Sequence, residues 1–159
     1  MQKFLDIKIS KRPIKLRLVN NADLKFTLDL HNKNVEKKKF FSKKKVLLRD
    51  HKKWFKKSKN TRMFFIGLSK YRIGYIRYDF VRKNNLSVSI AIKEKYKRKG
   101  FGKIMLNKSL EKKNIKKCNI FANIKNDNLS SKKFFLDSGF VAFKKNVYIK
   151  RAKKWAKNL

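Results

Sequence analysis

A basic stretch with two closely spaced glycines has the composition of a phosphate-binding loop. It covers residues 96–102 and has the sequence YKRKGFG. An alternating apolar run at Val88, Ile90 and Ile92 precedes it and predicts a β-strand, and a helical pattern begins after it at Lys103. Backbone N–H groups and the positive dipole end at a helix start attract anions, and glycine lets the backbone approach them closely. The sequence therefore predicts a site for a phosphorylated ligand between this strand and this helix.

The chain is strongly basic. It has 47 Lys and Arg residues against 10 Asp and Glu residues, which gives a net charge of +37 over 159 residues. Such a charge favours polyanionic partners, namely nucleic acid, acidic membranes or phosphorylated small molecules. An AT-biased coding sequence would also give many Lys, Asn, Ile and Phe residues and few Pro, Gly and Ala residues. The charge alone therefore does not identify the partner.

Length and composition indicate a folded protein. With 42% apolar and 13% aromatic residues, the chain fits a single domain over residues 1–159 that ends in a basic tail at about 151–159. The single cysteine, Cys118, favours a reducing compartment, and its apolar neighbours predict a buried small side chain. The chain has neither the ~18 consecutive apolar residues of a membrane span nor the apolar core of a signal peptide. We expect a cytoplasmic protein.

Hydrophobic periodicity predicts a mixed α and β architecture. The predicted strands cover residues 14–19, 62–68, 71–80, 86–92, 118–124, 140–143 and 147–149. Residues 24–30 form a helix or an irregular segment, and residues 32–46 form a solvated surface region with Phe40 and Phe41 packed inward. The strand order with intervening helices predicts an α+β fold with a mixed sheet.

Three helices have recognisable start or stop signals. Asp50 is the predicted N-cap of a helix through Phe55, and a second helix of about 14 residues follows the glycine loop. Asn128 is the predicted N-cap of a third helix over residues 129–137, which Gly139 ends.

Two short motifs stand in order, separated by a predicted strand, helix and strand. Residues 97–102 have the form Q/R-x-x-G-x-G/A, with Lys97 in place of Gln or Arg. Residues 128–131 have the form N-x-x-S and are followed by Phe135 and by residues 139–140, Gly-Phe. Together these motifs resemble the GCN5-related N-acetyltransferase (GNAT) family. The resemblance implies a mostly antiparallel mixed sheet flanked by helices and splayed between its fourth and fifth strands.

The resemblance also implies acetyl-CoA as the cofactor. The backbone amides of residues 98–102 would bind the CoA pyrophosphate, and the pantetheine arm would pair with the strand at residues 90–92, where an amide polarises the thioester oxygen. The basic side chains of the loop either contact the 3′-phosphate or belong to a generally basic surface. The expected cofactor-binding residues are Ile90, Ala91, Ile92, Lys97, Arg98, Lys99, Gly100, Phe101, Gly102, Asn128, Ser131 and Phe135.

The N-terminal half is similar to the branch of the family that acts on nucleotide-activated amino sugars, of the kind that makes pseudaminic-acid precursors. The matching residues are Asn32, Val35, Phe41, Ser42, the segment DHKKWF at 50–55 and the segment GYIRYD at 74–79. This resemblance implies that the acetyl group passes from acetyl-CoA to the primary amine of a nucleotide-linked amino sugar. A protein N-terminal or lysine acetyltransferase is the alternative within the same fold.

The implied reaction needs a base for the attacking amine and benefits from an acid for the leaving thiolate. Many family members carry a Tyr where this chain has Phe135, and the amino-sugar branch often carries a Glu where it has Ser87. Neither group is present, so Tyr148 or a water remains as the acid. The base is either an ordered water or one of a short list of side chains, which are Asp29, His31, Asp50, His51, Asp79 and Glu94. The expected catalytic residues are Asp79, Tyr148 and His51.

Arg77, His51 and Trp54 are the expected substrate-binding residues. Arg77 and Asp79 lie two residues apart on one strand face, where they either form an ion pair or contact the substrate. His51 and Trp54 share a helix face, so each is either a substrate contact or part of the core. The sequence predicts no metal site.

A nucleic-acid-binding module is the alternative from a different class. It requires aromatic side chains among basic residues on an exposed face, whereas the aromatic residues here alternate inward along the strands. We therefore expect a small-molecule amine acceptor as the partner, with no specific nucleic acid and no membrane span. The sequence leaves open whether the chain forms a homodimer.

Overall fold

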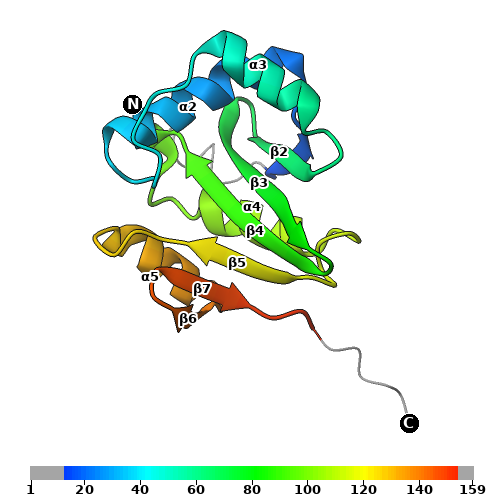
Figure 1. The fold of residues 1–159 in the computed structure, drawn as a ribbon, viewed down its shortest axis with the longest axis vertical. Helices are drawn as coiled ribbons and strands as arrows, with labels where there is room; N and C mark the ends of the chain where they lie inside the picture. The colour runs from blue at the N-terminus through cyan, green and yellow to red at the C-terminus, as the bar shows by residue number, and fades with distance from the viewer. Residues whose placement is uncertain (1–12, 154–159) are drawn as a thin grey trace.

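The computed structural model describes residues 13–153, so the predicted basic tail lies, from residue 154 onward, outside the described residues. Its seven-stranded sheet has the order β1-β2-β3-β4-β5-β7-β6 (Figure 1). The strands are β1 (Lys15–Leu18), β2 (Arg62–Leu68), β3 (Arg72–Arg82), β4 (Asn85–Ile92), β5 (Asn119–Asn123), β6 (Val141–Lys144) and β7 (Val147–Lys150). The α-helices are α2 (Leu24–Glu36), α3 (Leu48–Lys57), α4 (Phe101–Leu110) and α5 (Leu129–Asp137), with short 3₁₀ turns η1 (Asn21–Asp23) and η2 (Glu94–Tyr96). Within residues 13–153, no helix is long and apolar enough to cross a membrane.

The sheet is splayed at its one parallel pair. All neighbouring strands are antiparallel except β4 and β5, which pair only between residues 85–87 and residues 119–121. Beyond Ser87 the two strands diverge, as Figure 1 shows. The mixed, mostly antiparallel sheet that opens between its fourth and fifth strands confirms the fold expected from the sequence.

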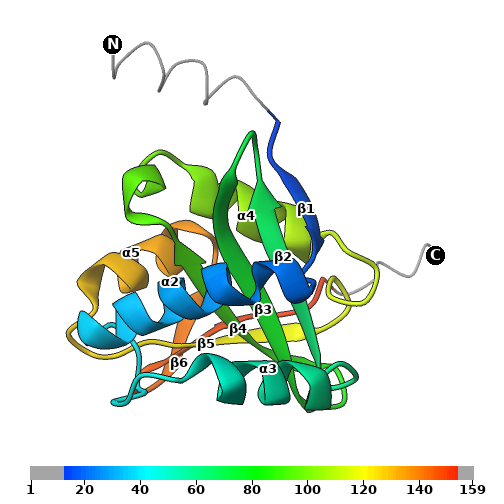
Figure 2. The same cartoon turned by 90° about the horizontal axis from the view of Figure 1, so that it is seen from above.

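Helices cover both faces of the sheet (Figure 2). On one face, Leu24 and Leu30 of α2 and the aromatic residues of α3 pack against Tyr75 and neighbouring side chains. On the other face, Met105 of α4 and residues of α5 pack against Ile76 and its neighbours. Successive residues of β3 thus enter opposite cores, which explains why the central strands are apolar at nearly every position.

Two helices differ in length from the prediction. Residues 24–36 form one continuous helix, so the predicted surface region begins only after Glu36. The buried side chains of Leu24, Leu28 and Val35 lie along this helix and hold it on the sheet. Helix α4 begins at Phe101 and ends at Leu110, and Ile115 is buried from a turn that follows the helix. Because Ile115 is apolar, the sequence pattern predicted that the helix continued to this residue.

Two predicted local features are wrong, and three are confirmed. The side chain of Phe41 is 53% exposed, whereas Phe40 is half-buried as expected. Asp50 lies within the first turn of α3 and is not its N-cap, and its negative charge suits the positive end of the helix dipole there. Asn128 does cap α5 by accepting a hydrogen bond from the Ser131 N–H at 3.3 Å, and Gly139 ends that helix with φ +84°.

Candidate active site

A groove opens where β4 and β5 diverge. We call it the cofactor groove. It has a volume of about 300 Å³ and lies between β4, the loop before α4 and the start of α5. Most of the residues expected to bind the cofactor line it, namely Ile90, Ala91, Ile92, Lys97, Arg98, Gly100, Gly102, Asn128 and Ser131. Of the remaining three, Phe101 is buried in the core, Phe135 lines the adjoining cavity, and Lys99 does not line the groove.

The loop before α4 has a backbone suited to an anion. Arg98 and Gly100 both have positive φ, at 59° and 81°. A Cβ on Gly100 would have no neighbour within 4 Å, so this glycine serves the backbone conformation and leaves open space. A Cβ on Gly102 would lie 3.2 Å from Cε2 of Phe134, so this glycine allows α4 to pack closely. The first N–H groups of α4 have no partner within the helix, and a diphosphate at this position would satisfy them.

The exposed edge of β4 suits an extended ligand that contains amide groups. From Val88 to Ile92 the strand pairs with β3 on one side and has no strand partner among residues 13–153 on the other. Such an edge presents alternating N–H and C=O groups that an extended chain can pair with. The pantetheine arm of CoA carries two amides, so the strand edge and the anion-binding loop together fit this cofactor.

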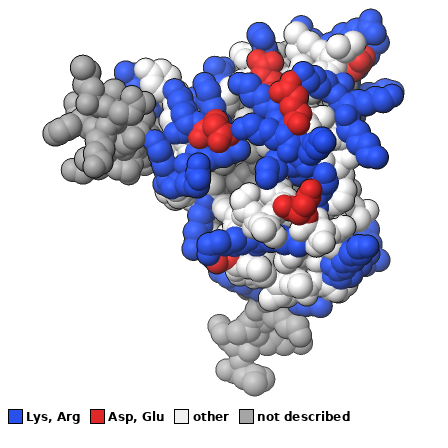
Figure 3. Space-filling view, turned by 90° about the vertical axis from the view of Figure 1, so that its left-hand side faces the viewer, with Lys and Arg blue, Asp and Glu red and all other residues white. Residues whose placement is uncertain are grey.

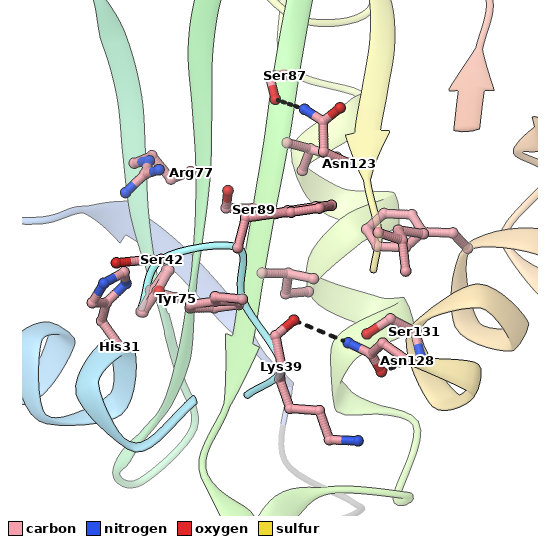
Figure 4. Close-up of a pocket in the computed structure, with 16 residues that line it drawn as sticks. His31, Lys39, Ser42, Tyr75, Arg77, Ser87, Ser89, Asn123, Asn128 and Ser131 are labelled. Atoms are coloured by element: carbon pink, nitrogen blue, oxygen red, sulfur yellow. Dashed lines mark hydrogen bonds between the residues drawn. The ribbon is translucent and has the colours of Figure 1, made fainter. Parts of the chain in front are cut away.

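A second cavity of about 230 Å³ continues from the cofactor groove, and we call it the acceptor cavity. The two share part of their lining, which includes Lys39, Phe40, Ile90, Asn128 and Ser131. The other polar residues of the acceptor cavity are His31, Ser42, Tyr75, Arg77, Ser87, Ser89 and Asn123. Figure 4 shows His31, Ser42 and Arg77 on the α2 side of β4, and Asn123, Asn128 and Ser131 on the β5 and α5 side.

The segment between α2 and α3 is tied down at the junction of the groove and the cavity. We call residues 37–46 the strap. Near its end, the amide side chain of Asn32 donates to the Val46 carbonyl and accepts from the Val46 N–H, both at 2.9 Å. Near its start, Nδ2 of Asn128 donates to the Lys39 carbonyl at 3.4 Å (Figure 4). The strap therefore connects α2 to the start of α5 across the site.

Burial sets the protonation of two side chains in the acceptor cavity. Burial and the nearby charge of Arg77 lower the pKa of His31 from its usual 6.5, so the imidazole is neutral at pH 7. Burial raises the pKa of Tyr75 to about 12, so the phenol keeps its proton. The cavity lining therefore contains one neutral nitrogen base and one hydroxyl donor.

The sequence and structure match known acetyltransferases. The model of the acetyltransferase (GNAT) family matches residues 28–140 of this chain. The chain belongs to the GNAT acetyltransferase family. It is therefore an acetyl-CoA-dependent N-acetyltransferase, as the two sequence motifs predicted. The protein-sequence comparison adds nothing finer, because no curated protein matches the chain.

Solved structures share the GNAT fold at low sequence identity. A domain from Methanocaldococcus jannaschii is 23% identical with a TM-score of 0.73, covering 87% of this chain and 97% of that one. Spermidine N-acetyltransferase from Vibrio cholerae, in complex with CoA and spermine, is 17% identical with a TM-score of 0.74, covering 86% and 91%. Ribosomal-protein-alanine N-acetyltransferase from Brucella melitensis is 18% identical with a TM-score of 0.72, covering 85% and 96%.

None of the three residues expected to be catalytic lines the acceptor cavity of this GNAT enzyme. Asp79 forms ion pairs with Nε of Arg77 at 2.9 Å and Nε of Arg62 at 3.4 Å. Tyr148 lies on β7, where it pairs opposite Ala122 of β5 and packs against the core. Neither side chain lines the groove or the cavity, and their catalytic roles stay a prediction.

His51, the third, is packed beneath α3. Its side chain is only 9% exposed, and Nε2 lies 3.1 Å from Oγ1 of Thr27. Its ring stacks on Trp54 with 5.2 Å between ring centroids. Burial, with the nearby His31 and Arg77, lowers the pKa of His51 to about 4. These contacts fit the packed alternative that the sequence left open.

The other two residues expected to bind the substrate lie in different places. Arg77 lines the acceptor cavity, whereas Trp54 does not. The Trp54 ring supports the guanidinium groups of Arg62, at 3.9 Å from the ring centroid, and of Arg77, at 5.3 Å. Trp54 therefore lies outside the cavity lining and contacts the cavity residue Arg77.

Several cavity residues were not singled out from the sequence. Tyr75 and Ser89 share the sheet face of Arg77, since Arg77 pairs opposite Ser89 and Tyr75 lies two residues earlier. That alternation was visible in the sequence, but the register between β3 and β4 was not. Asn123 stands at the end of β5, where its Nδ2 donates to Oγ of Ser87 at 3.4 Å. Within the described residues, no group of His, Cys, Asp and Glu could hold a metal ion.

Proposed function

We propose that this GNAT enzyme acetylates the primary amine of a small acceptor that carries a negative charge, namely a nucleotide-activated amino sugar. The observation that carries the proposal is the charge of the acceptor cavity. Arg77 and Lys39 line it, and no Asp or Glu of the described residues lines it or the cofactor groove. A phosphate-bearing acceptor gains charge-assisted hydrogen bonds in such a cavity.

An ion pair with Asp79 positions Arg77 in the cavity for such an acceptor. Asp79 binds Arg77 through Nε, and the Arg62 guanidinium pairs with the same carboxylate. Two guanidinium groups against one carboxylate leave a net positive charge at this end of the cavity. The two terminal nitrogens of a guanidinium match the geometry of a phosphate, which a bidentate contact exploits.

A cationic acceptor fits this cavity poorly. A polyamine carries several positive charges and needs carboxylates to hold them, and the described lining offers none. Basic peptides and protein N-termini would also approach a chain with a net charge of +37. Like charges repel over the Debye length, so the field of the whole protein favours acidic acceptors.

Residues of this chain can divide the work of the reaction. Acetyl-CoA, when bound, supplies an acetyl group activated as a thioester. The loop at residues 98–102 binds the pyrophosphate, the edge of β4 from Val88 to Ile92 orients the pantetheine arm, and Asn128 joins the strap to α5. The strap keeps water from the junction, and Arg77 holds the acceptor with its amine toward that junction.

We place the enzyme in the cytoplasm. Cys118 is a free cysteine, half-buried beside the core, which suits a reducing compartment.

An acceptor panel tests the proposal. Release of free CoA thiol is followed with a nucleoside-diphosphate amino sugar, the same amino sugar without the nucleotide, spermidine, and a peptide with a free N-terminus. The proposal expects the highest kcat/KM for the nucleotide-linked sugar. Turnover confined to spermidine or to the peptide would refute the amino-sugar assignment while leaving the GNAT activity intact.

A further inference from the structure

The amine of a biological acceptor arrives mostly as an ammonium ion, so a proton must leave before the nitrogen can attack. In the transfer, the N–C bond to the acetyl group forms while the C–S bond breaks, and the thiolate departs with the electron pair. The nitrogen loses one proton before it attacks and a second as the amide forms. The first proton needs an acceptor, and the second passes to the departing thiolate, directly or through water. A general base that lies within reach of the amine contributes typically 10²- to 10⁴-fold to the rate.

We propose that the imidazole of His31 is this base and takes the proton from the acceptor amine. The proposal rests on the proposed function, because it assigns a role within the same cavity. His31 belongs to α2 and lines the acceptor cavity on the side of Arg77 (Figure 4). After transfer, the imidazolium returns its proton to the solvent.

The other titratable groups in the cavity lining do not provide a basic atom near neutral pH. Lys39 and Arg77 are cations, and the phenol of Tyr75 keeps its proton because burial raises its pKa to about 12. No carboxylate of the described residues lines the cavity. The carboxylate of Asp79 lies outside the cavity lining, where it forms ion pairs with Arg77 and Arg62. Elimination within the lining leaves His31.

Packing fixes the position of the ring. The imidazole of His31 lies against the ring of Phe40, with 5.3 Å between ring centroids and an angle of 40°. Phe40 belongs to the strap and lines both the cofactor groove and the acceptor cavity. The same contact therefore holds the base and brings it toward the junction where the amine must meet the thioester.

The charged surroundings keep the imidazole in its basic form. It shares the cavity lining with Arg77 and Tyr75 of β3 and with Lys39 of the strap, and it interacts electrostatically with Arg77 and with His51 of α3. None of these is an anion, and burial together with the charge of Arg77 lowers the pKa of His31. A lowered pKa means that the base is fully available at pH 7 and is lost only as the pH falls below about 6.5.

The test is the pH dependence of kcat/KM for wild type and His31→Gln with the best acceptor of the panel. The wild type is expected to be flat from about pH 7 up to the pKa of the amine. Without the base, only amine already deprotonated in solution reacts, so the variant is expected to be about 10²-fold slower at pH 7. Its rate should then rise about tenfold per pH unit toward the wild-type value.

Two further measurements do not depend on turnover. Calorimetric titration should show that His31→Gln binds acetyl-CoA with unchanged affinity, because the proposed base lies in the acceptor cavity. In an NMR titration of the free protein, the pKa of the His31 imidazole should lie below 6.5. His51→Gln is the comparison variant, since Nε2 of His51 lies 3.1 Å from Oγ1 of Thr27 and His51 does not line the acceptor cavity.

Three results would overturn the assignment. A His31→Gln profile that is lower but parallel to the wild type would show that the ring only shapes the cavity. A steep profile in His51→Gln instead would move the base to that histidine, and a His31 ring still protonated above pH 7 would exclude it as the base. If no acceptor of the panel is acetylated, the proposed function fails, while the NMR titration still decides whether His31 can act as a base.

Discussion

At the residue scale, the two glycines at the start of α4, Gly100 and Gly102, have different roles. Gly100 sits at φ +81° with open space around it, whereas Gly102 faces the ring of Phe134. Only the first of these requires a left-handed backbone, which asparagine tolerates far better than a β-branched residue.

We predict that Gly100→Val lowers the free energy of unfolding by about 1–2 kcal/mol, the cost of forcing this backbone conformation. The same variant should weaken acetyl-CoA binding, because the loop relaxes away from the pyrophosphate. Gly100→Asn is the matched control and should keep both properties close to wild type. Urea unfolding and calorimetric titration measure the two effects, and equal behaviour of Val and Asn would contradict the role given to the positive φ.

Sequence alone located some site residues and missed others for a physical reason. Alternation along a strand says which residues share a face, and this placed Arg77 and Asp79 on one side of β3. It does not predict which of them pairs with an arginine from a neighbouring strand. In the structure, Arg62 of β2 pairs with Asp79. His31 was among the candidate bases, but its place in the acceptor cavity depended on α2 continuing past residue 30, which the polar composition of that segment concealed.

At the scale of elements, Asn128 links α5 to the strap through two separate hydrogen bonds. Its Oδ1 caps the helix through the Ser131 N–H, and its Nδ2 holds the Lys39 carbonyl. Asn128→Ala removes both, and Asn128→Ser removes only the amide donor, since serine is itself a good N-cap.

We predict that Asn128→Ala lowers the free energy of unfolding by about 1 kcal/mol, whereas Asn128→Ser stays within a few tenths of wild type. Both variants should speed hydrogen exchange in the strap, because both release the Lys39 carbonyl. Chemical unfolding and hydrogen-exchange mass spectrometry separate the two effects. Unchanged exchange of residues 37–46 in both variants would show that this hydrogen bond does not hold the strap.

Asp23 joins three elements at one buried carboxylate. It accepts hydrogen bonds from Arg17 of β1 at 2.6 and 2.9 Å, from Arg72 of β3 at 2.8 Å and from the Asn20 N–H at 3.0 Å. Burial alone would raise the pKa of Asp23, but these hydrogen bonds outweigh it and lower the pKa to about 2. The ionised carboxylate therefore stabilises the fold fully above about pH 4, and this stabilisation is lost as the pH falls toward 2.

We predict that Asp23→Asn lowers the free energy of unfolding at pH 7 by about 3 kcal/mol, because two arginines lose their buried partner. Its difference from the wild type should shrink as the pH falls from 4 to 2. Asp29→Asn, at an exposed pair with Lys25, is the control and should change stability by less than about 0.5 kcal/mol. Urea unfolding at pH 7 and pH 3 measures both, and a difference that does not depend on pH would contradict this account.

The order of elements was predictable because strands and turns leave strong local patterns, but the two cavities were not. The loop glycines and the cap of α5 each have a local sequence signal, and both were predicted. The acceptor cavity instead joins residues of α2, the strap, β3, β4 and β5, which only the tertiary fold brings together. Sequence patterns were also misleading at Ile115. This apolar residue is buried in a turn after α4, but the sequence predicted that it belongs to the helix.

At the scale of the whole molecule, the positive charge surrounds the open side of the sheet. Figure 3 shows this face, toward which the C-terminal ends of β4 and β5 point, and Lys and Arg dominate it. The aromatic side chains buried in the two cores of the described residues, such as Phe64, Tyr75 and Phe140, cannot stack on nucleotide bases. The field therefore suits two acidic small molecules, CoA and a phosphate-bearing acceptor, better than a nucleic-acid strand.

The most direct test of an acidic acceptor compares Arg77→Gln with Arg62→Gln. Both arginines pair with Asp79, but only Arg77 lines the acceptor cavity. For the nucleotide-linked amino sugar, Arg77→Gln should reduce kcat/KM by about 10- to 100-fold, the loss of a charge-assisted hydrogen bond of about 1.5–3 kcal/mol. The same sugar without its nucleotide should be nearly unaffected, and Arg62→Gln should change neither by more than about threefold. Equal losses for both sugars, or no loss for the nucleotide-linked sugar, would contradict the central claim.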